Sequence, residues 1–218
     1  MKKSDACLIR VFDILLALVL LPFAVIIFAL LIIPQLICFG KLFYVSQRTG
    51  KNNATFVYVK LKSMYDIPGV SPDYISVAGD GGSRAHLETG RIPPWGRFLR
   101  KTHLDEIPEI AFILTGRESF VGPRPLLAEH ITLVDTAERR RMKPGWTGLS
   151  QVFLKSRGIL PSRIQRRLDM RMGRELTLRL YIKILCATLA VSRHRSLNPG
   201  PTVIAYRKSI QGKQHETN

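Results

Sequence analysis

The chain opens with a long apolar segment. No charged residue occurs between Asp13 and Lys41, and residues 14–40 consist largely of Leu, Ile, Val, Phe and Ala. A helix of this length measures about 40 Å, more than the hydrocarbon core of a bilayer at about 30 Å. The pattern therefore predicts one membrane-embedded helix. A secretory signal is the alternative because Lys2 and Lys3 resemble its basic start, but the segment is too long and lacks a small-residue cleavage site.

A proline and the flanking charges bear on how such a helix enters the membrane. Pro22 removes one backbone hydrogen bond and crowds the preceding turn. Lysine and arginine favour the cytoplasmic side of a membrane, and they flank both ends of the segment. They are Lys2, Lys3 and Arg10 before it and Lys41, Arg48 and Lys51 after it. A re-entrant helix broken at Pro22 would return to the same side, but spanning helices also tolerate proline, so both forms stay open.

After residue 41 the hydrophobic and polar positions follow shorter periods. Residues 56–61 (FVYVKL) are β-branched and aromatic, which predicts a strand. Residues 66–90 are rich in Gly, Ser, Pro and Asp, which predicts a loop. Residues 96–114 have a helical pattern that is interrupted near Pro108.

The rest of the chain predicts more helix. Residues 136–142 form a short polar helix, and residues 164–195 have a long helical pattern. Its apolar patch, residues 180–191, contains Lys183 and is too short to span a membrane. This patch suits an amphipathic helix in the headgroup layer or a helix packed on the core.

Together these elements predict an α+β fold that is mostly helical, with little sheet. Residues 1–40 form the membrane helix, and residues 41–218 form one cytoplasmic domain with interfacial helices. An apolar helix face meets either lipid or a second copy of the chain, so a homo-oligomer is possible and the oligomeric state stays open.

Composition adds a strong positive charge. The chain has 33 Lys and Arg against 16 Asp and Glu, a formal net charge of +17. Such an excess favours nucleic acid, anionic lipid headgroups or phosphorylated substrates. The N-terminal concentration of apolar residues favours a membrane over nucleic acid. Cys7, Cys38 and Cys186 follow no metal-ligand spacing, and no role is assigned to them.

Two adjacent carboxylates are the first candidates for chemistry. Asp105 and Glu106 follow the cationic residues Arg100, Lys101 and His103. Neighbouring residues on a helix point about 100° apart, so the two carboxylates would have different roles. One would attack an electrophile, and the other would hold a divalent cation such as Mg²⁺ beside substrate phosphates. By spacing alone, a solvated helix face is the more common explanation of such a pair.

Two later segments also suit a phosphorylated ligand. In Gly122-Pro123-Arg124-Pro125 the flanking prolines hold the arginine stiffly, and its planar guanidinium fits a phosphate. In KPGWTGLSQV (residues 143–152), glycines beside a hydroxyl and an amide suit a nucleotide pocket. A rigid surface turn is the simpler interpretation of each segment.

In combination these segments resemble the bacterial sugar transferases, the monotopic phosphoglycosyl transferases that act on undecaprenyl phosphate. The order and spacing of four motifs carry the resemblance, which covers almost the whole chain after Arg10. The motifs are RVFDILL (residues 10–16), GRFLRKTHLDEIPE (96–109), LTGRESFVGPRP (114–125) and KPGWTGLSQV (143–152).

The resemblance implies a reaction and roles for particular residues. Asp105 would attack the β-phosphate of a UDP-sugar, which gives an acyl-phosphosugar and releases UMP. Glu106 would help hold Mg²⁺, and undecaprenyl phosphate would then take the phosphosugar at the cytoplasmic face of the bacterial inner membrane. The resemblance also implies a re-entrant helix broken at Pro22. Substrate contacts are expected from Arg124, Lys60, Lys62, Arg100 and Gln151.

Several positions depart from the family pattern. Lys62 stands where an arginine is usual, Glu109 where glutamine is common and Phe112 where asparagine is common. A late aspartate of the family is Tyr181 here. These departures motivate an alternative, a non-catalytic membrane-anchored relative that acts as a binding or assembly protein. A basic nucleic-acid binder is a third hypothesis, but the chain has no recognisable module for it, and we expect no nucleic-acid partner.

Overall fold

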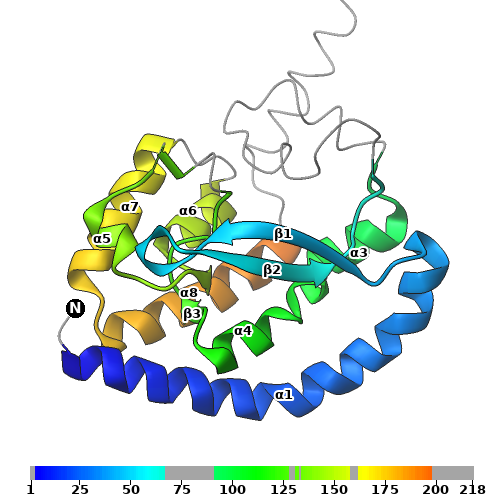
Figure 1. The fold of residues 1–218 in the computed structure, drawn as a ribbon, viewed down its shortest axis with the longest axis horizontal. Helices are drawn as coiled ribbons and strands as arrows, with labels where there is room; N and C mark the ends of the chain where they lie inside the picture. Colours follow the sequence, from blue (N-terminus) through cyan, green and yellow to red (C-terminus); the bar gives the residue numbers. More distant parts are fainter. Residues whose placement is uncertain (1–2, 67–90, 128–130, 133, 158–161, 198–218) are drawn as a thin grey trace, which may run out of the picture.

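The computed structural model describes residues 3–66, 91–127, 131–132, 134–157 and 162–197 (Figure 1). Helices dominate this part of the chain, and its strands form two sheets of two strands each. This arrangement confirms the predicted mostly helical α+β fold with little sheet.

The N-terminal segment forms a single long helix, α1 (Lys3–Phe39). The predicted break at Pro22 is wrong, because α1 continues through both Pro22 and Pro34 and curves as a whole (Figure 1). A proline inside a helix removes one hydrogen bond and bends the axis, and the helix continues when its neighbours keep helical backbone angles. The helix ends one residue before the predicted boundary at residue 40.

One narrow stripe of α1 is buried against the rest of the molecule. The stripe residues follow one another at intervals of four or seven, which keeps them on one face of the helix. They are Ile9, Asp13, Ala17, Ala24, Leu31 and Gln35. The two polar members are bonded: Asp13 accepts from the Phe120 N–H at 3.2 Å, and Gln35 donates to the Lys62 carbonyl at 2.6 Å.

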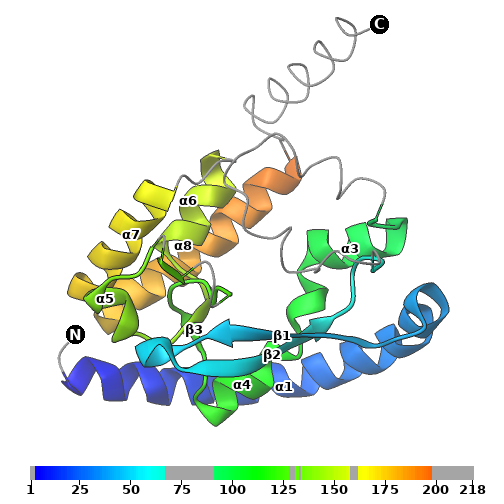
Figure 2. The ribbon, with the colours of Figure 1, turned by 45° about the horizontal axis from the view of Figure 1, so that its top comes forward.

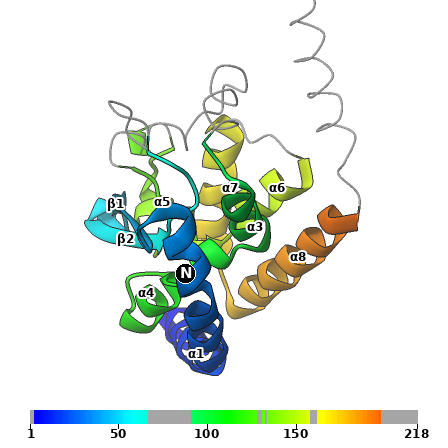
Figure 3. The same ribbon diagram turned by 90° about the vertical axis from the view of Figure 1, so that its right-hand side faces the viewer.

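The opposite face of α1 is apolar and exposed. Leu30 is 73% exposed and Ile37 is 82% exposed. Figure 3, in which α1 is seen nearly end-on, shows the helix at the edge of the molecule below α4 (Glu109–Thr115). Within the described residues, α1 is the one helix long and apolar enough to cross a membrane.

The first sheet is an antiparallel hairpin of β1 (Phe43–Thr49) and β2 (Thr55–Leu61). Strand β2 confirms the strand predicted at residues 56–61, whereas β1 was not predicted from the sequence. The short 3-10 turn η1 (Lys51–Asn53) joins the strands, and Asn52 and Asn53 adopt the left-handed conformation that asparagine tolerates. The loop predicted after β2 falls, from residue 67 onward, outside the described residues.

The predicted interrupted helix at residues 96–114 is present as three pieces. They are α3 (Pro94–Thr102), the 3-10 turn η3 (Leu104–Glu106) and α4. The interruption begins before Pro108, because His103 adopts a left-handed backbone conformation (φ 57°) and ends α3.

The second sheet is parallel and pairs β3 (Ser119–Val121) with β4 (Gly145–Thr147). In the sequence, α5 (Ala137–Arg140) comes between β3 and β4, and it confirms the predicted short polar helix. Its N-cap is Thr136, whose hydroxyl accepts from the Arg139 N–H at 3.1 Å.

Three helices follow β4 in the chain, namely α6 (Leu149–Arg157), α7 (Ser162–Glu175) and α8 (Leu178–Leu197). Helices α6 and α8 pack on the second sheet, and α7 packs on α5 and α6. The helical pattern at residues 164–195 is therefore divided, since Leu176 enters the core and the Thr177 hydroxyl accepts from the Leu180 N–H at the start of α8. Figure 2 shows α6, α7 and α8 together on one side of the molecule and α3 on the other.

Helix α8 packs on the core through one face only. Tyr181 and Ile184 are buried in the same cluster as the first half of α1, whereas Leu189 is 73% exposed. The core-packing alternative is thus correct for one face of α8. A headgroup location for its other face stays a prediction.

Candidate functional site

The candidate site is built around the turn between α3 and α4, which lies against β2. Left-handed His103 redirects the chain, so that Asp105 and Glu106 lie on η3 and not on a regular helix. Successive residues of a 3-10 turn point about 120° apart. The two carboxylates accordingly have different neighbours.

Asp105 is buried among cations. Its side chain is 5% exposed. Burial is the main reason why the pKa of Asp105 lies above its ordinary value, and the charge of Glu106 adds to this effect. The nearby charges of Lys60, Arg100 and His103 act in the opposite direction and favour the carboxylate.

Glu106 is the more strongly ionised member of the pair. Burial alone would raise its pKa, but the contact with His103 and the charge of Arg124 outweigh burial, so that the pKa of Glu106 is lowered. The His103 Nδ1 to Glu106 Oε2 distance is 3.5 Å. The Glu106 side chain is 23% exposed, which leaves it accessible to a ligand.

A pocket with about 390 Å³ of empty space opens beside Glu106. Its wall combines cationic, acidic and aromatic side chains from β1, β2, η3, α4, β4 and the segment that follows β3. The lining residues are Arg48, Tyr58, Lys60, Glu106, Glu109, Arg124, Pro125, Gly145 and Trp146. Such a mixture of cations and a carboxylate suits a phosphorylated ligand that arrives with a divalent cation.

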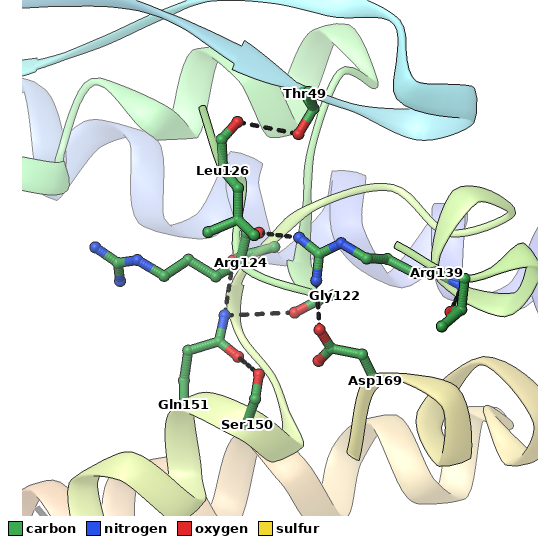
Figure 4. Close-up of polar contacts among 10 residues, drawn as sticks. Thr49, Gly122, Arg124, Leu126, Arg139, Ser150, Gln151 and Asp169 are labelled. Atoms are coloured by element: carbon green, nitrogen blue, oxygen red, sulfur yellow. Dashed lines mark hydrogen bonds and ion pairs between the residues drawn. The ribbon is translucent and has the colours of Figure 1, made fainter. Parts of the chain in front are cut away.

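Arg124 is presented to this pocket by a fixed backbone. Three alternate carbonyl groups of its segment accept hydrogen bonds: Gly122 from Gln151, Arg124 from Arg139 and Leu126 from Thr49 (Figure 4). The Arg124 side chain leaves this anchored segment in another direction and stays exposed (Figure 4). The predicted stiff presentation of Arg124 therefore depends on tertiary contacts as well as on the two prolines.

The Arg139 anchor is itself held by a buried ion pair. Its guanidinium contacts Asp169 on α7, which is completely buried. This pair was not predicted from the sequence, because Arg139 occurs within a basic run on a polar helix and Asp169 lies in a different, arginine-rich helix. No local pattern marks them as partners.

Glycines allow two of the sequence motifs to touch. A Cβ atom on Gly122 would lie 2.2 Å from the Lys143 carbonyl oxygen, and one on Gly145 would lie 2.2 Å from the Gly122 nitrogen. Both distances are far below van der Waals contact, so only glycine permits this backbone approach. The glycines of the KPGWTGLSQV segment thus serve close packing against the GPRP segment, and Gly145 also lines the pocket.

The other predicted substrate residues occupy different places. Lys60 lines the pocket, and burial lowers its pKa. Arg100 lies near Asp105 and donates from Nε to the Ser63 hydroxyl at 3.0 Å. Lys62 pairs with Asp66, and neither lines the pocket.

Gln151 lies beneath the pocket. Its side chain is buried and donates to the carbonyls of Gly122 and Gly145 at 3.5 and 3.4 Å. Its predicted contact with substrate stays a prediction, as does that of Lys62. The structure brings Asp105, Glu106, Lys60, Arg100 and Arg124 together as one group.

A second pair of carboxyl groups adjoins this group. Glu109 accepts a hydrogen bond from Tyr58, and burial followed by the charges of Glu106 and Glu118 raises its pKa well above the ordinary value. Glu118 is fully buried, and neither carboxyl oxygen has a partner among the described residues. Burial raises the pKa of Glu118 to about 8.

The residues of the pocket fit a Mg²⁺ ion that is coordinated partly by the protein and partly by the phosphate groups of a bound substrate. The described residues contain no cluster of three or more His, Cys, Asp or Glu side chains that would form an all-protein metal site. Mg²⁺ characteristically uses one or two carboxylates and completes its shell with phosphate oxygens and water. Glu106, ionised and accessible in the pocket, meets this requirement.

Several pocket residues were missed at the sequence level. Tyr58 occurs in a predicted strand, and its spacing of two from Lys60 was an available signal, since alternate strand residues share a face. Arg48 was predicted only as a charge that flanks the apolar segment, and Glu109 only as a departure from the family pattern, whereas both line the pocket. The arrangement as a whole suits attack by a carboxylate on a phosphorus atom beside cations that stabilise negative charge.

Comparison with known proteins gives a consistent result. Residues 4–195 match the family described as "Bacterial sugar transferase". The chain is 30% identical over 185 residues to the "Uncharacterized sugar transferase EpsL" of Bacillus subtilis, which covers 83% of this chain and 84% of that protein. It is 32% identical over 152 residues to the "Exopolysaccharide production protein ExoY" of Rhizobium meliloti, covering 66% and 67%.

A third relative is larger. The chain is 34% identical over 161 residues to the "Undecaprenyl-phosphate galactose phosphotransferase" of Salmonella typhimurium. The match covers 69% of this chain and 33% of that protein. The similarity thus concerns about a third of the longer relative.

Proposed function

We propose, from the premise that the chain belongs to the bacterial sugar transferase family, that it transfers a sugar-1-phosphate from a UDP-sugar to undecaprenyl phosphate. Two relatives whose names state this type of reaction support the proposal: the Salmonella galactose phosphotransferase and the "UDP-glucose:undecaprenyl-phosphate glucose-1-phosphate transferase" of Xanthomonas campestris. The latter is 36% identical over 118 residues, which cover 52% of this chain and 23% of that protein. The transfer would be the first membrane step in the assembly of a bacterial glycan.

The observation that carries the proposal is the position of Asp105. It is a buried carboxyl group whose neighbours include Lys60, Arg100 and His103, beside a pocket that contains Arg124. A carboxylate so placed is suited to nucleophilic attack, since the same cations that favour its ionised form also attract a diphosphate.

The first step is attack by an Asp105 carboxylate oxygen on the sugar-linked phosphorus. An oxygen–phosphorus bond forms, the bond from that phosphorus to the bridging diphosphate oxygen breaks, and UMP leaves. Arg124 and Lys60 stabilise the negative charge on the phosphate oxygens during this exchange. The product is an acyl-phosphosugar on Asp105.

The second step regenerates the protein. A phosphate oxygen of undecaprenyl phosphate attacks the same phosphorus, the bond to Asp105 breaks, and the lipid diphosphate sugar is formed. Because the donor nucleotide leaves before the lipid reacts, one small pocket serves both substrates in turn.

Mg²⁺ is the proposed cofactor, with Glu106 as its protein ligand. The ion would neutralise part of the diphosphate charge. His103 and Arg124 keep Glu106 ionised, so its carboxylate is available to a cation at neutral pH.

The exposed apolar face of α1 supports a membrane location for the reaction. Its outer side chains, among them Leu30 and Ile37, would lie in lipid, while the buried stripe holds the rest of the protein at the surface. We propose that this is the cytoplasmic face of the inner membrane, where a nucleotide sugar is available.

A direct test is UMP release by purified protein from a panel of UDP-sugars, with Mg²⁺ and undecaprenyl phosphate. Release with one sugar and its loss in Asp105→Asn would establish the reaction and identify the donor. If folded protein releases no UMP from any sugar of the panel while an active relative does so as a control, the result would favour the alternative, a non-catalytic membrane-anchored binding protein. This alternative is motivated by Lys62, Phe112 and Tyr181, where the chain departs from the family pattern.

A further inference from the structure

A second basic cavity lies beside the first turns of α1. It has about 520 Å³ of empty space and shares no lining residue with the pocket at Glu106. Four cationic residues from separate parts of the chain line it, namely Arg10, Lys51, Arg141 and Lys143. The reaction proposed above uses none of them.

The cavity has little negative charge of its own. Asp13 is its one acidic lining residue, and Asp13 is 1% exposed. Its carboxylate already accepts hydrogen bonds from the Tyr181 hydroxyl, the Ser119 hydroxyl and the Phe120 N–H. No ion pair joins Lys51, Arg141 or Lys143 to a carboxylate within the described residues.

The side chains of Arg10 and Lys143 both end close to Gly116. A Cβ atom placed on Gly116 would lie 3.3 Å from Arg10 Nη2 and 3.3 Å from Lys143 Nζ. Arg10 is fixed there, because it donates to the carbonyls of Ile113 and Leu114 at 2.5 and 2.7 Å. Burial, with the charges of Arg10 and Lys51, lowers the pKa of Lys143. Such like-charge crowding is unfavourable unless an anion compensates it.

The position of the cavity indicates the source of the anion. Its wall includes Ala6 and Ile9 of α1. On the same turns of the helix, Leu8 and Val11 point outward and are 52% and 50% exposed. If the apolar face of α1 lies in a membrane, the cavity opens at the level of the lipid headgroups.

We propose that this cavity binds the phosphate group of an anionic membrane lipid, with Lys51, Arg141 and Lys143 as ligands and Arg10 as a fixed positive charge. Bound lipid would hold the N-terminal end of α1 at the membrane surface. A free phosphate ion has the same chemistry, so the test includes both sources.

The test uses the full chain in a neutral detergent and the double variant Lys51→Gln/Lys143→Gln. The matched control is Arg166→Gln/Arg167→Gln, which removes the same charge from the exposed surface of α7. Binding to phosphatidylcholine vesicles is measured with and without phosphatidylglycerol. No UDP-sugar is present, so the result is independent of the proposed reaction.

We expect the preference for phosphatidylglycerol vesicles to fall about tenfold in the double variant and less than about twofold in the control. An equal fall in both variants would show a net-charge effect and overturn the proposal. Should the double variant fail to fold, Arg141→Gln at the exposed rim provides the same comparison with a smaller expected loss.

A second measurement identifies the source of the anion. Thermal unfolding of the wild type and the double variant is followed in detergent with and without inorganic phosphate. If phosphate stabilises the wild type but not the double variant, and the wild type shows no preference for anionic vesicles, the anion is a free phosphate ion. That result would overturn the proposal that a lipid binds in the cavity. No difference between the two proteins in either measurement would overturn the site itself.

Discussion

Two pairs of carboxyl groups lie close together in this protein and have different environments. The turn pair, Asp105 and Glu106, lies among Lys60, Arg100, His103 and Arg124. The core pair, Glu109 and Glu118, lies deeper, and both the burial of Glu118 and the charge of Glu106 raise the pKa of Glu118. The pKa of Glu106 is consequently lowered, while that of Glu109 is raised well above the ordinary value and that of Glu118 to about 8.

This difference shows that neither residue type nor closeness in sequence determines the ionisation and role of a carboxyl group. Glu106 and Glu109 are three residues apart and line the same pocket. One faces positive charges and is available to a cation, whereas the other is hydrogen-bonded to Tyr58 and surrounded by further acidic groups. Nearby charge and burial set their roles.

The largest effect is expected at the proposed nucleophile. Asp105→Asn should reduce UMP release by about 10⁴-fold, because an amide of nearly the same shape has no nucleophilic oxygen. The measurement is turnover with circular dichroism and vesicle binding as controls for folding and membrane attachment. Retained turnover would exclude the covalent mechanism.

A smaller loss is expected at the second member of the turn pair. Glu106→Gln should reduce turnover by about 10²-fold and raise the Mg²⁺ concentration needed for half-maximal rate, since a neutral amide binds the ion weakly. A magnesium titration of both proteins measures this. A parallel loss of rate with an unchanged magnesium requirement would assign Glu106 a role other than metal binding.

The core pair should affect stability and its dependence on pH. Between the ordinary glutamate pKa of about 4.3 and the raised value of about 8, the folded protein binds more protons at Glu118 than the unfolded chain does. Its contribution to stability is therefore present at low pH and lost as the pH rises to about 8. Glu118→Gln removes this loss.

Denaturation in urea at pH 5 and pH 8 measures the difference. We expect the wild type to lose about 3 kcal/mol more than Glu118→Gln between the two pH values, because nearly three pH units at about 1.4 kcal/mol each separate pH 5 from the raised pKa of about 8. Equal losses in the two proteins would mean that Glu118 is ionised or hydrated in the folded state.

The smallest effect is expected at Glu109. Glu109→Gln keeps the shape of the side chain and an acceptor for the Tyr58 hydroxyl. Turnover should stay within about threefold of the wild type, which makes this variant the matched carboxyl-to-amide control for Asp105→Asn. A loss as large as that of Asp105→Asn would place Glu109 in the chemistry and remove the distinction between the two pairs.

Part of the site could be predicted from local sequence. Asp105 and Glu106 are adjacent, and the cations before them are within a few residues, so the pattern itself indicated the pair. Arg124 was indicated by its two prolines. The anchors of its backbone were not, because Thr49, Arg139 and Gln151 reach it from three distant segments.

The sequence by itself determined the long apolar helix, the β2 strand, the interrupted helix around the acidic pair and the mostly helical fold class. Each depends on the periodicity of side chains or on a proline or glycine within one segment, which local physics translates directly into structure. The family followed from four motifs in fixed order.

Only the tertiary structure decided that α1 continues through Pro22, that β3 pairs with β4, and that two basic cavities lie apart on the same small protein. It also decided which carboxyl groups face cations. These features arise where segments far apart in the chain pack together, and there burial and the charge of distant residues outweigh anything that a local pattern specifies.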